Sequence, residues 1–388
     1  MSETVKYVKR VGTDCNKWDG MGDRFGDSDL MALWVADMDF VVPECARQAV
    51  IKYAEFGIYG YHKTPEGYFK AFIDWEKQYH NCEIKREWIK FAPGVVSPIN
   101  WYVHMKTQPG DGVIVMTPVY YPFLDAINNN GRTLVSSDLV NTNGIYTVDF
   151  ADFEDKIVKN NVKLFILSSP HNPVGRVWTK AELEQMLKIC RKHKVFVIAD
   201  EIHHDLIMPG HNHTEILTIE GYNDMLVAIT AGSKTFNLAG CKNSFVILPD
   251  DKLRAEYDNY LQQIRINSGA SFGYVAIEAA FKGGREWLEG VIDIINANAQ
   301  YIKNELADKL PKAVVSPLEG TYLLWVDLGA YVEQGKMQEL IQNKCRLAVD
   351  YGSWFGGDRF GGFIRLNLAT SPENIKDAVA RIVKEIKG

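Results

Sequence analysis

Short, wholly apolar runs recur through the middle of the chain, and each ends abruptly in polar residues. They lie at 113–116, 164–167, 195–199 and 226–229. Between them apolar residues recur every three or four positions, as in the segment that follows Thr179, with Leu183, Met186, Leu187 and Cys190. A short apolar run predicts a buried strand, and a 3.6-residue period predicts an amphipathic helix. This alternation predicts an α/β fold with a mostly parallel sheet and helices on both faces.

One strand departs from this order. The apolar stretch 244–249 follows the run at 226–229 by only about a dozen residues, without a helical pattern between them. A parallel crossover needs at least that much chain, usually as a helix. We therefore expect 244–249 to run antiparallel to its neighbours.

The last hundred residues have a different pattern. Periodic apolar positions predict helices at 287–310, around 335–343 and at 372–386, with strands at 321–327 and 363–367. This order predicts a second, smaller α+β domain. We expect the chain to divide into an N-terminal arm (1–45) packed on the small domain, a large domain (46–287) and a small C-terminal domain (288–388). The first thirty residues are polar and turn-rich, so we expect little regular structure there.

Composition excludes several classes of partner. Of 388 residues 46% are apolar and 24% charged, as in ordinary globular proteins. The net charge of −6 disfavours nucleic acid and anionic membranes. No apolar stretch reaches the roughly 18 residues of a membrane span. The six cysteines form no Cys-x-x-Cys pair, and the charged amino terminus lacks a signal-type apolar core, so we expect a cytoplasmic protein with reduced thiols.

Three predicted strands deliver reactive groups at their carboxyl ends, where parallel sheets bind ligands. Lys234 follows one strand among small residues, Asp200 ends another, and Asn172 leaves a third. A lysine in a dry pocket loses its charge readily and can bond to an aldehyde. A carboxylate that emerges from a wholly apolar strand needs a cationic partner. Taken singly, each group is more often structural than functional.

A fourth loop completes the set. Gly94, Val95 and Val96 stand at the start of a predicted helix, where free backbone N–H groups suit a phosphate. A ligand with a phosphate, an aldehyde, a phenolic oxygen and a protonatable ring nitrogen satisfies all four loops. Pyridoxal 5′-phosphate (PLP) has these groups, and its protein partners include a lysine and an acid at the ring nitrogen. The sequence therefore predicts a PLP site.

These loops lie within motifs that resemble those of the fold-type I PLP enzymes, the aspartate aminotransferase superfamily. The narrower resemblance is to the cystathionine β-lyases and cysteine C–S lyases. The motifs span nearly the whole chain and are WVADMDF (34–40), YGYH (59–62), APGVVS (92–97), TPVYYP (117–122), PHNPVGR (170–176), ADEIHHD (199–205), SKTFNLAG (233–240) and FIRLN (363–367). The resemblance implies a seven-stranded sheet in a PLP transferase-like large domain.

The resemblance also implies a role for individual residues. Lys234 would hold the cofactor and move protons, Asp200 would pair with the ring nitrogen, and Tyr121 would stack on the ring. The other implied cofactor contacts are Val95, Val96, Asn172, His203, Ser233 and, from the neighbouring subunit of a homodimer, Tyr61.

Two further implied contacts concern the substrate. Arg365 would bind the substrate carboxylate through its bidentate fork, and the loop that contains Ala36 would close over the substrate.

Several positions keep alternatives open. Arg365 on a strand is also typical of a surface ion pair, the segment 34–40 fits an edge strand as well as a loop, and only one of Tyr120 and Tyr121 is expected over the ring. Where many superfamily members have a phosphate-binding arginine, this chain has Lys242, and the segment 350–356 lacks an expected proline. The group His203, His204, Asp205, His211 and His213 matches no metal-ligand spacing, so we predict no metal.

The resemblance favours β-elimination on cystathionine, cysteine or cysteine S-conjugates, which yields pyruvate, ammonia and a thiol. The alternative within the same class is an aminotransferase. An alternative from another class is a regulatory protein that retains PLP only as a structural ligand, and a third is an inert relative of the fold. Retention of Lys234, Asp200 and Arg365 together favours catalysis, because a structural ligand needs no substrate clamp.

Overall fold

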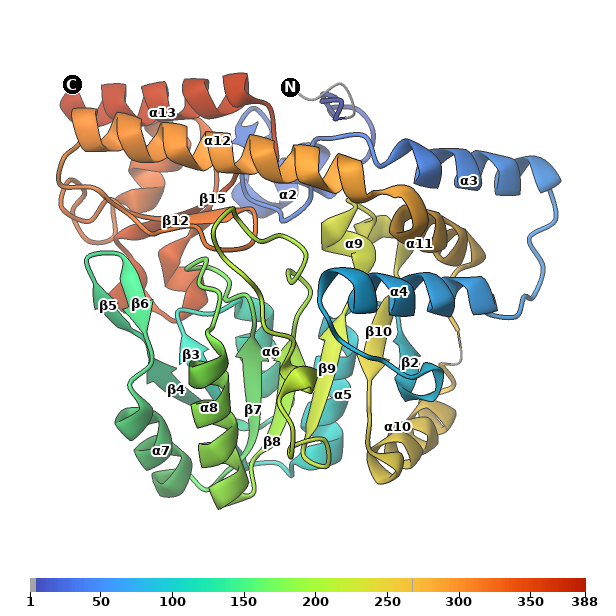
Figure 1. The fold of residues 1–388 in the computed structure, drawn as a ribbon. Coiled ribbons are helices and arrows are strands. Elements are labelled where there is room, and N and C mark those ends of the chain that lie inside the picture. Colours follow the sequence, from blue (N-terminus) through green and yellow to red (C-terminus); the bar gives the residue numbers. More distant parts are fainter. Residues whose placement is uncertain (1–4, 267) are drawn as a thin grey trace.

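The computed structural model describes residues 5–266 and 268–388, which build two main sheets, two small two-stranded sheets and the helices around them (Figure 1). The larger sheet has seven strands in the order β2-β10-β9-β8-β7-β3-β4. Their bounds are β2 (Ile89–Ala92), β3 (Gly112–Thr117), β4 (Thr133–Asp138), β7 (Val162–Ser168), β8 (Phe196–Asp200), β9 (Leu226–Thr230) and β10 (Ser244–Ile247). The predicted seven-stranded α/β sheet is confirmed.

Strand β10 is antiparallel to both of its neighbours, β9 and β2, whereas the pairs from β9 to β4 are parallel. The orientation predicted for 244–249 is confirmed. The connection from β9 contains only the single turn α9 (Gly232–Thr235) and a 3₁₀ turn at Ala239–Cys241. It is too short for a helical crossover, so the chain returns in the opposite direction.

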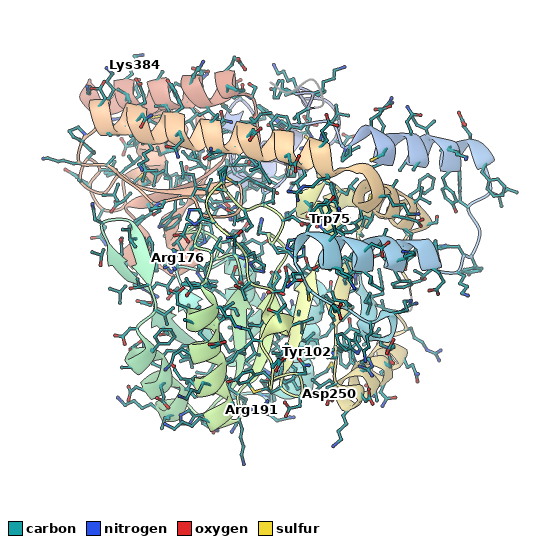
Figure 2. All side chains as sticks on the ribbon, viewed as in Figure 1. Trp75, Tyr102, Arg176, Arg191, Asp250 and Lys384 are labelled. Carbon is teal, nitrogen blue, oxygen red and sulfur yellow. The ribbon has the colours of Figure 1, made fainter. Side chains whose placement is uncertain are left out.

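The central strands bury side chains on both faces. In β3, Val113 and Val115 pack into one apolar layer, and Ile114 and Met116 pack into the other, because successive side chains of a strand alternate. The first layer is covered by α5 (Val96–Lys106), α6 (Tyr121–Asn128) and α10 (Asp251–Ile264). The second is covered by α4 (Glu66–Tyr79), α7 (Phe150–Lys159), α8 (Lys180–His193) and α11 (Ser271–Gly283). Side chains fill both layers (Figure 2).

The smaller sheet is antiparallel throughout, in the order β11-β12-β15-β14. Its strands are β11 (Val314–Val315), β12 (Leu323–Asp327), β14 (Asp350–Tyr351) and β15 (Phe363–Asn367). The helices α12 (Arg285–Lys309) and α13 (Pro372–Lys387) lie side by side above it at the top of Figure 1. The helix expected around 335–343 is centred later and wound more widely, as a π-helix at Glu339–Lys344.

The N-terminal arm has more regular structure than its composition predicts. It contains α1 (Asn16–Asp19) and α2 (Met21–Phe25), and β1 (Met31–Ala32) pairs in parallel with β13 (Leu347–Ala348) of the C-terminal part. The helix α3 (Glu44–Phe56) follows, and an exposed connection leads from it to α4 at the right of Figure 1. We propose the division into an arm (1–45), a large domain (46–287) and a small domain (288–388), with the boundary in the first turn of α12.

Several short elements lie outside the two main sheets and the helices that cover them. They are the hairpin β5 (Val140–Thr142) and β6 (Ile145–Thr147) and the 3₁₀ helices Arg86–Trp88, Ile216–Thr218, Gly352–Phe355 and Asp358–Phe360. Over the described residues, none of the helices combines the length and the apolar character that crossing a membrane requires.

A buried ion pair joins two segments of the N-terminal arm. Lys17 donates to Asp39 at 2.9 Å, and both side chains are fully buried. Asp39 also accepts from the indole of Trp18 at 2.9 Å.

We expect Lys17→Met to lower the free energy of unfolding by about 3 kcal/mol, because it leaves a buried carboxylate without its main cation. Urea unfolding monitored by circular dichroism measures this. Lys9→Met, at an exposed position of the same arm, is the control, and equal losses in the two variants would contradict the prediction.

Candidate active site

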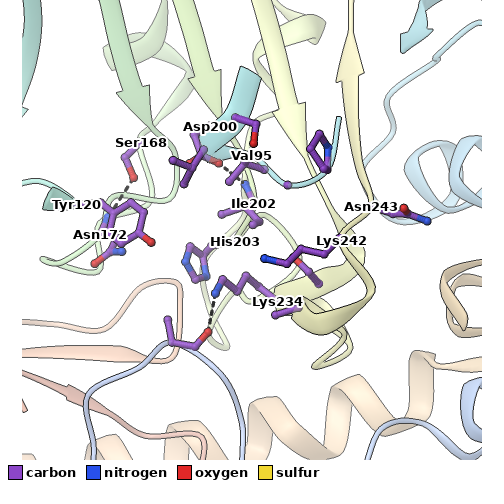
Figure 3. A pocket seen from close by; sticks show the side chains of 17 residues that line it. Val95, Tyr120, Ser168, Asn172, Asp200, Ile202, His203, Lys234, Lys242 and Asn243 are labelled. Atoms are coloured by element: carbon purple, nitrogen blue, oxygen red, sulfur yellow. Dashed lines mark hydrogen bonds between the residues drawn. The ribbon is translucent and has the colours of Figure 1, made fainter. Parts of the chain in front are cut away.

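A cavity of about 270 Å³ lies at the carboxyl ends of the parallel strands. It collects side chains from β7, β8, β9, the start of α5 and the arm (Figure 3). The predicted site residues among its lining are Ala36, Val95, Val96, Asn172, Asp200, His203, Ser233 and Lys234. Chain segments almost two hundred residues apart therefore meet at one place, as the strand topology requires.

Lys234 is carried by the single turn α9 that begins two residues after β9. Its Nζ donates to the carbonyl oxygen of Ala36 at 2.5 Å. Burial, the largest cause, and the nearby Arg365 together lower the pKa of Lys234 to about 8 against the opposing charges of Asp37 and Asp200. At pH 7 roughly a tenth of this amine, and at pH 8 about half of it, is therefore uncharged and able to act as a nucleophile or base.

Asp200 ends β8 and is almost completely buried. Burial raises the pKa of its carboxyl to about 7, and the backbone N–H of Ile202, which donates to it at 3.1 Å, and the charge of Lys234 offset this only in part. Among the residues that the structure describes, no basic side chain forms an ion pair with Asp200. A ring N–H⁺ in the cavity would supply the missing cation.

His203 is buried and faces the same space. Burial, together with the charges of Lys234 and Arg365, holds the pKa of its imidazole well below the usual range, so the ring is neutral. Its Nδ1 atom is buried without a hydrogen-bond partner. An unsatisfied buried polar atom of this kind indicates room for a ligand atom.

The opposite end of the cavity suits an anion. Val95 and Val96 stand at the N-terminus of α5, where the first N–H groups have no acceptor within the helix. The ammonium group of Lys242 and the side chain of Ser233 reach the same space (Figure 3 labels Lys242). A phosphate at one end and a cationic ring nitrogen at the other are the features of PLP, so the residues present fit the predicted cofactor.

The structure corrects one predicted contact. Tyr120 lines the cavity, whereas Tyr121 does not. Tyr121 is the first residue of α6, and its ring is directed to the small domain, where it packs against Trp354 and Phe355 at 6.1 and 5.8 Å between ring centres. The ring-stacking role assigned to Tyr121 therefore fits Tyr120 instead. Two adjacent tyrosines in a loop carry no sequence signal that decides between them.

Arg365 is 1% exposed, so a surface ion pair is excluded. It forms a buried ion pair with Asp350 and donates to Asn172 Oδ1 at 2.9 Å and to the carbonyl of Trp34 at 3.2 Å. Its Nε atom has no partner. Arg365 thus stands behind Asn172, beside the cavity rather than in its lining, with one donor free.

The segment around Ala36 is a loop and not an edge strand, because β1 ends at Ala32. Asn367 holds it from the small domain by donating to the carbonyls of Val35 and Asp37 at 2.6 and 2.7 Å. Tyr61 is itself fully exposed, on the connection between α3 and α4. It is not among the residues that line the cavity of its own chain.

Sequence reasoning missed two groups. Ser168 and Ile202 line the cavity without belonging to a recognised role. A buried cluster of acids and histidines also lies outside that lining, and Glu76, His80, His204 and Glu215 in it offer ligand atoms within 4.8 Å of one another. Its members come from α4 and from the loop after β8, and the distant α4 contribution has no sequence signal.

This cluster is not arranged like a metal centre. The rings of His80 and His204 stack at 4.5 Å with an angle of 14° between their planes. An imidazole lone pair lies in the plane of its ring, so two nearly parallel, stacked rings do not direct their nitrogens at one ion. His203 faces the cavity and His211 is exposed. The prediction of no metal at this place stays a prediction, and the geometry fits a hydrogen-bonded network.

Fold and cavity together are those of a family. The chain belongs to the aminotransferase class I and II family, whose sequence pattern matches residues 28–382. It is similar to cystathionine beta-lyase PatB of Bacillus subtilis, with 36% identity over 381 residues that cover 97% of this chain and 98% of the relative. It is also similar to protein MalY of Escherichia coli, with 29% identity over 100% of this chain and 99% of the relative.

Solved structures agree with these relatives. Cystalysin from Treponema denticola, which contains a pyridoxal 5′-phosphate cofactor, superposes with a TM-score of 0.94 at 35% identity and covers 100% of this chain and 99% of its own. The PLP-bound C–S lyase from Staphylococcus hominis superposes with a TM-score of 0.93 at 29% identity and covers 99% of this chain and 97% of its own.

Because the pKa of Asp200 is raised, we expect the stability of the cofactor-free protein to depend on pH. Between the ordinary value of 3.8 and about 7, the folded state holds a proton that the unfolded state has lost, so stability falls as pH rises through this window and stays lower above it. We expect Asp200→Asn to be more stable than the parent at pH 8 by up to about 4 kcal/mol, and equal to it below pH about 4.

Urea unfolding at the two pH values measures the difference. Asp74→Asn, at an exposed carboxylate, is the matched control and should change stability little at either pH. Equal stability of Asp200→Asn and the parent at pH 8 would show that Asp200 is not desolvated.

Proposed function

We propose that this protein is a PLP-dependent carbon–sulfur lyase that catalyses β-elimination on cystathionine, cysteine or cysteine S-conjugates. The observation that carries the proposal is that an easily deprotonated Lys234 and a buried Asp200 line the same cavity. Full-length similarity to a cystathionine beta-lyase supports the choice of reaction. The reaction consumes water and an amino acid that carries sulfur on its β-carbon, and it yields pyruvate, ammonia and a thiol, or hydrogen sulfide when the substrate is cysteine.

The described residues would hold the cofactor at both ends. Lys234 would bond to its aldehyde carbon, Asp200 would face the ring nitrogen, and Tyr120 would cover the ring. Val95, Val96, Ser233 and Lys242 would bind the phosphate, and Asn172 and His203 would lie beside the ring oxygen. When bound, PLP supplies an electron sink that stabilises negative charge at the α-carbon of the substrate.

Lys234 is the proposed base at that carbon. Its lowered pKa leaves enough free amine near pH 8 to remove the α-proton, and the same group can return a proton to the departing sulfur. Asp200, as a carboxylate, would keep the ring nitrogen protonated. At an effective dielectric constant of about 20, a charge pair separated by about 4 Å is worth roughly 4 kcal/mol.

Arg365 is the proposed receptor for the substrate carboxylate. Its unpartnered Nε and its planar fork suit a carboxylate, and its ion pair with Asp350 and its bond to Asn172 fix its orientation. The Ala36 loop, anchored by Asn367, would exclude water from the substrate. A positioned base together with a carboxylate clamp favours catalysis over a purely structural use of PLP.

Amino transfer is the second candidate, because the same family includes relatives that carry it out. Kynurenine–oxoglutarate transaminase 3 of Mus musculus is 27% identical over 69% of this chain.

We also propose a homodimer located in the cytoplasm. All six cysteines are free thiols in the structure, and Tyr61 extends from an exposed connection that also bears Ile58 and Tyr59.

We expect the purified protein to release pyruvate and free thiol from cystathionine without an added keto acid. Lys234→Ala should lower kcat by about 10³-fold or more, because the base is lost. Lactate dehydrogenase-coupled detection of pyruvate and a thiol reagent measure the two products. Lys180→Ala, at an exposed lysine, is the control and should keep full activity. Amino transfer to a keto acid without pyruvate release from cystathionine would reject the lyase in favour of an aminotransferase.

The homodimer predicts complementation between two defective chains. Tyr61→Ala should weaken PLP binding, because its side chain would reach the phosphate in the neighbouring site. Mixing Tyr61→Ala with Lys234→Ala chains should restore activity, since one site of each mixed dimer then has both an intact Lys234 and an intact Tyr61. Activity measured after subunit exchange tests this. If exchange is verified by mass and no activity returns, the site is not shared between subunits.

A further inference from the structure

Asp205 is the meeting point of three elements behind the cavity. Its Oδ1 atom accepts from the indole of Trp75 at 2.8 Å and lies 2.7 Å from Nε2 of His80. Its Oδ2 atom accepts from the hydroxyl of Thr235 at 2.7 Å and lies 3.2 Å from Nε2 of His204. All four partners are buried or nearly so. Trp75 extends from α4 in the part of the molecule where α9 lies (Figure 2).

Three of the cofactor-facing side chains have a sequence neighbour among the buried acids and histidines or bonded to them. Asp200 is followed by Glu201, whose carboxylate lies 3.3 Å from Nε2 of His213 and accepts from the backbone of Ile216 at 2.9 Å. His203 is followed by His204, and Lys234 is followed by Thr235. The cavity is thus lined by one side of the loop after β8 and of the turn α9, and the network holds their other side.

The Thr235–Asp205 bond joins the two segments that must keep a fixed separation. Thr235 is fully buried on the turn that carries Lys234, and Asp205 ends the turn that carries His203. The turn α9 has only four residues, so its own hydrogen bonds fix it weakly. Burial opposes ionisation of Asp205, but His204 and His80 outweigh it and hold the pKa of that carboxyl well below its usual range. The acceptor is therefore charged, which strengthens the bond.

We propose that Asp205 and Thr235 are positioning residues that keep the Lys234 amine desolvated and opposite Asp200 and His203. The proposal rests on Lys234 as the cofactor lysine and extends it by assigning what keeps that lysine desolvated. Without the Thr235 hydroxyl, α9 loses its tie to the loop after β8 and water gains access to the amine. The charged groups that face this amine are Asp37 in the arm, Asp200 at the end of β8 and Arg365 on β15.

The test is Thr235→Val, which keeps the shape of the side chain and removes only its hydroxyl. The amine must be uncharged to react with an aldehyde, so the pH profile of the rate at which PLP recombines with the cofactor-free protein reports the pKa of Lys234. The parent should give a midpoint near the pKa of about 8. In Thr235→Val we expect the midpoint to rise by about one pH unit, because desolvation is relieved, and PLP to bind about tenfold more weakly.

Two further variants separate positioning from general stability. Thr235→Ser retains the hydroxyl and should restore the midpoint and the affinity of the parent. Thr107→Val removes a buried hydroxyl at the far end of α5 and should lower the melting temperature without moving the midpoint. If Thr235→Val does not fold, Trp75→Phe removes another donor to Asp205 and should shift the midpoint in the same direction.

A Thr235→Val protein with the stability loss of Thr107→Val and an unchanged midpoint and affinity would overturn the proposal. Failure of the parent itself to form a covalent adduct with PLP would instead reject Lys234 as the cofactor lysine. The two outcomes are therefore distinguishable.

Discussion

The site depends on the removal of water from two groups of opposite charge. Lys234 and Asp200 are both more easily neutralised than they would be in water, because the surrounding strands and turns replace their hydration shells with apolar surface. Their attraction compensates only part of that cost. A cation placed beside Asp200 would therefore stabilise its carboxylate, and an electrophile placed beside Lys234 could bond to its amine. A cofactor with a basic ring nitrogen and an aldehyde provides the cation for Asp200 and the electrophile for Lys234.

Sheet register brings the two groups together. Ser168 is paired with Asp200 across β7 and β8, and Asp200 is paired with Ile229 across β8 and β9. The three strands therefore end at nearly the same level, and the loops that leave them open into the same space. The short return to β10 keeps Lys234 on a single turn close to the sheet instead of at the end of a long crossover helix.

The arm supplies a further part of the cavity wall through Ala36, and residues of the C-terminal part hold that loop in place. The carbonyl of Ala36 accepts from both Lys234 and Tyr322, and Asn237 donates to the carbonyls of Met38 and Phe40. The buried pair of Lys17 with Asp39 holds two segments of the arm together. The loop over the cavity is thus tied both to the turn α9 and to Tyr322 beside β12.

The amino-acid sequence by itself determined the seven-stranded sheet, its one antiparallel strand and most of the cavity residues. These features follow from local signals: apolar runs, helical periods, connection lengths and residues that end strands. It did not distinguish Tyr120 from Tyr121, because direction at the start of α6 depends on how that helix packs against Phe355. It also gave no sign that Arg365 is buried against Asp350.

Only the tertiary structure placed His80 and Trp75 of the α4 region against Asp205 and turned His203 and His204 to opposite sides. Contacts between segments more than a hundred residues apart leave no local pattern, because they depend on how helices pack on the sheet. Burial has the same origin, and it is burial that moves the pKa values on which the chemistry of Lys234 and Asp200 depends.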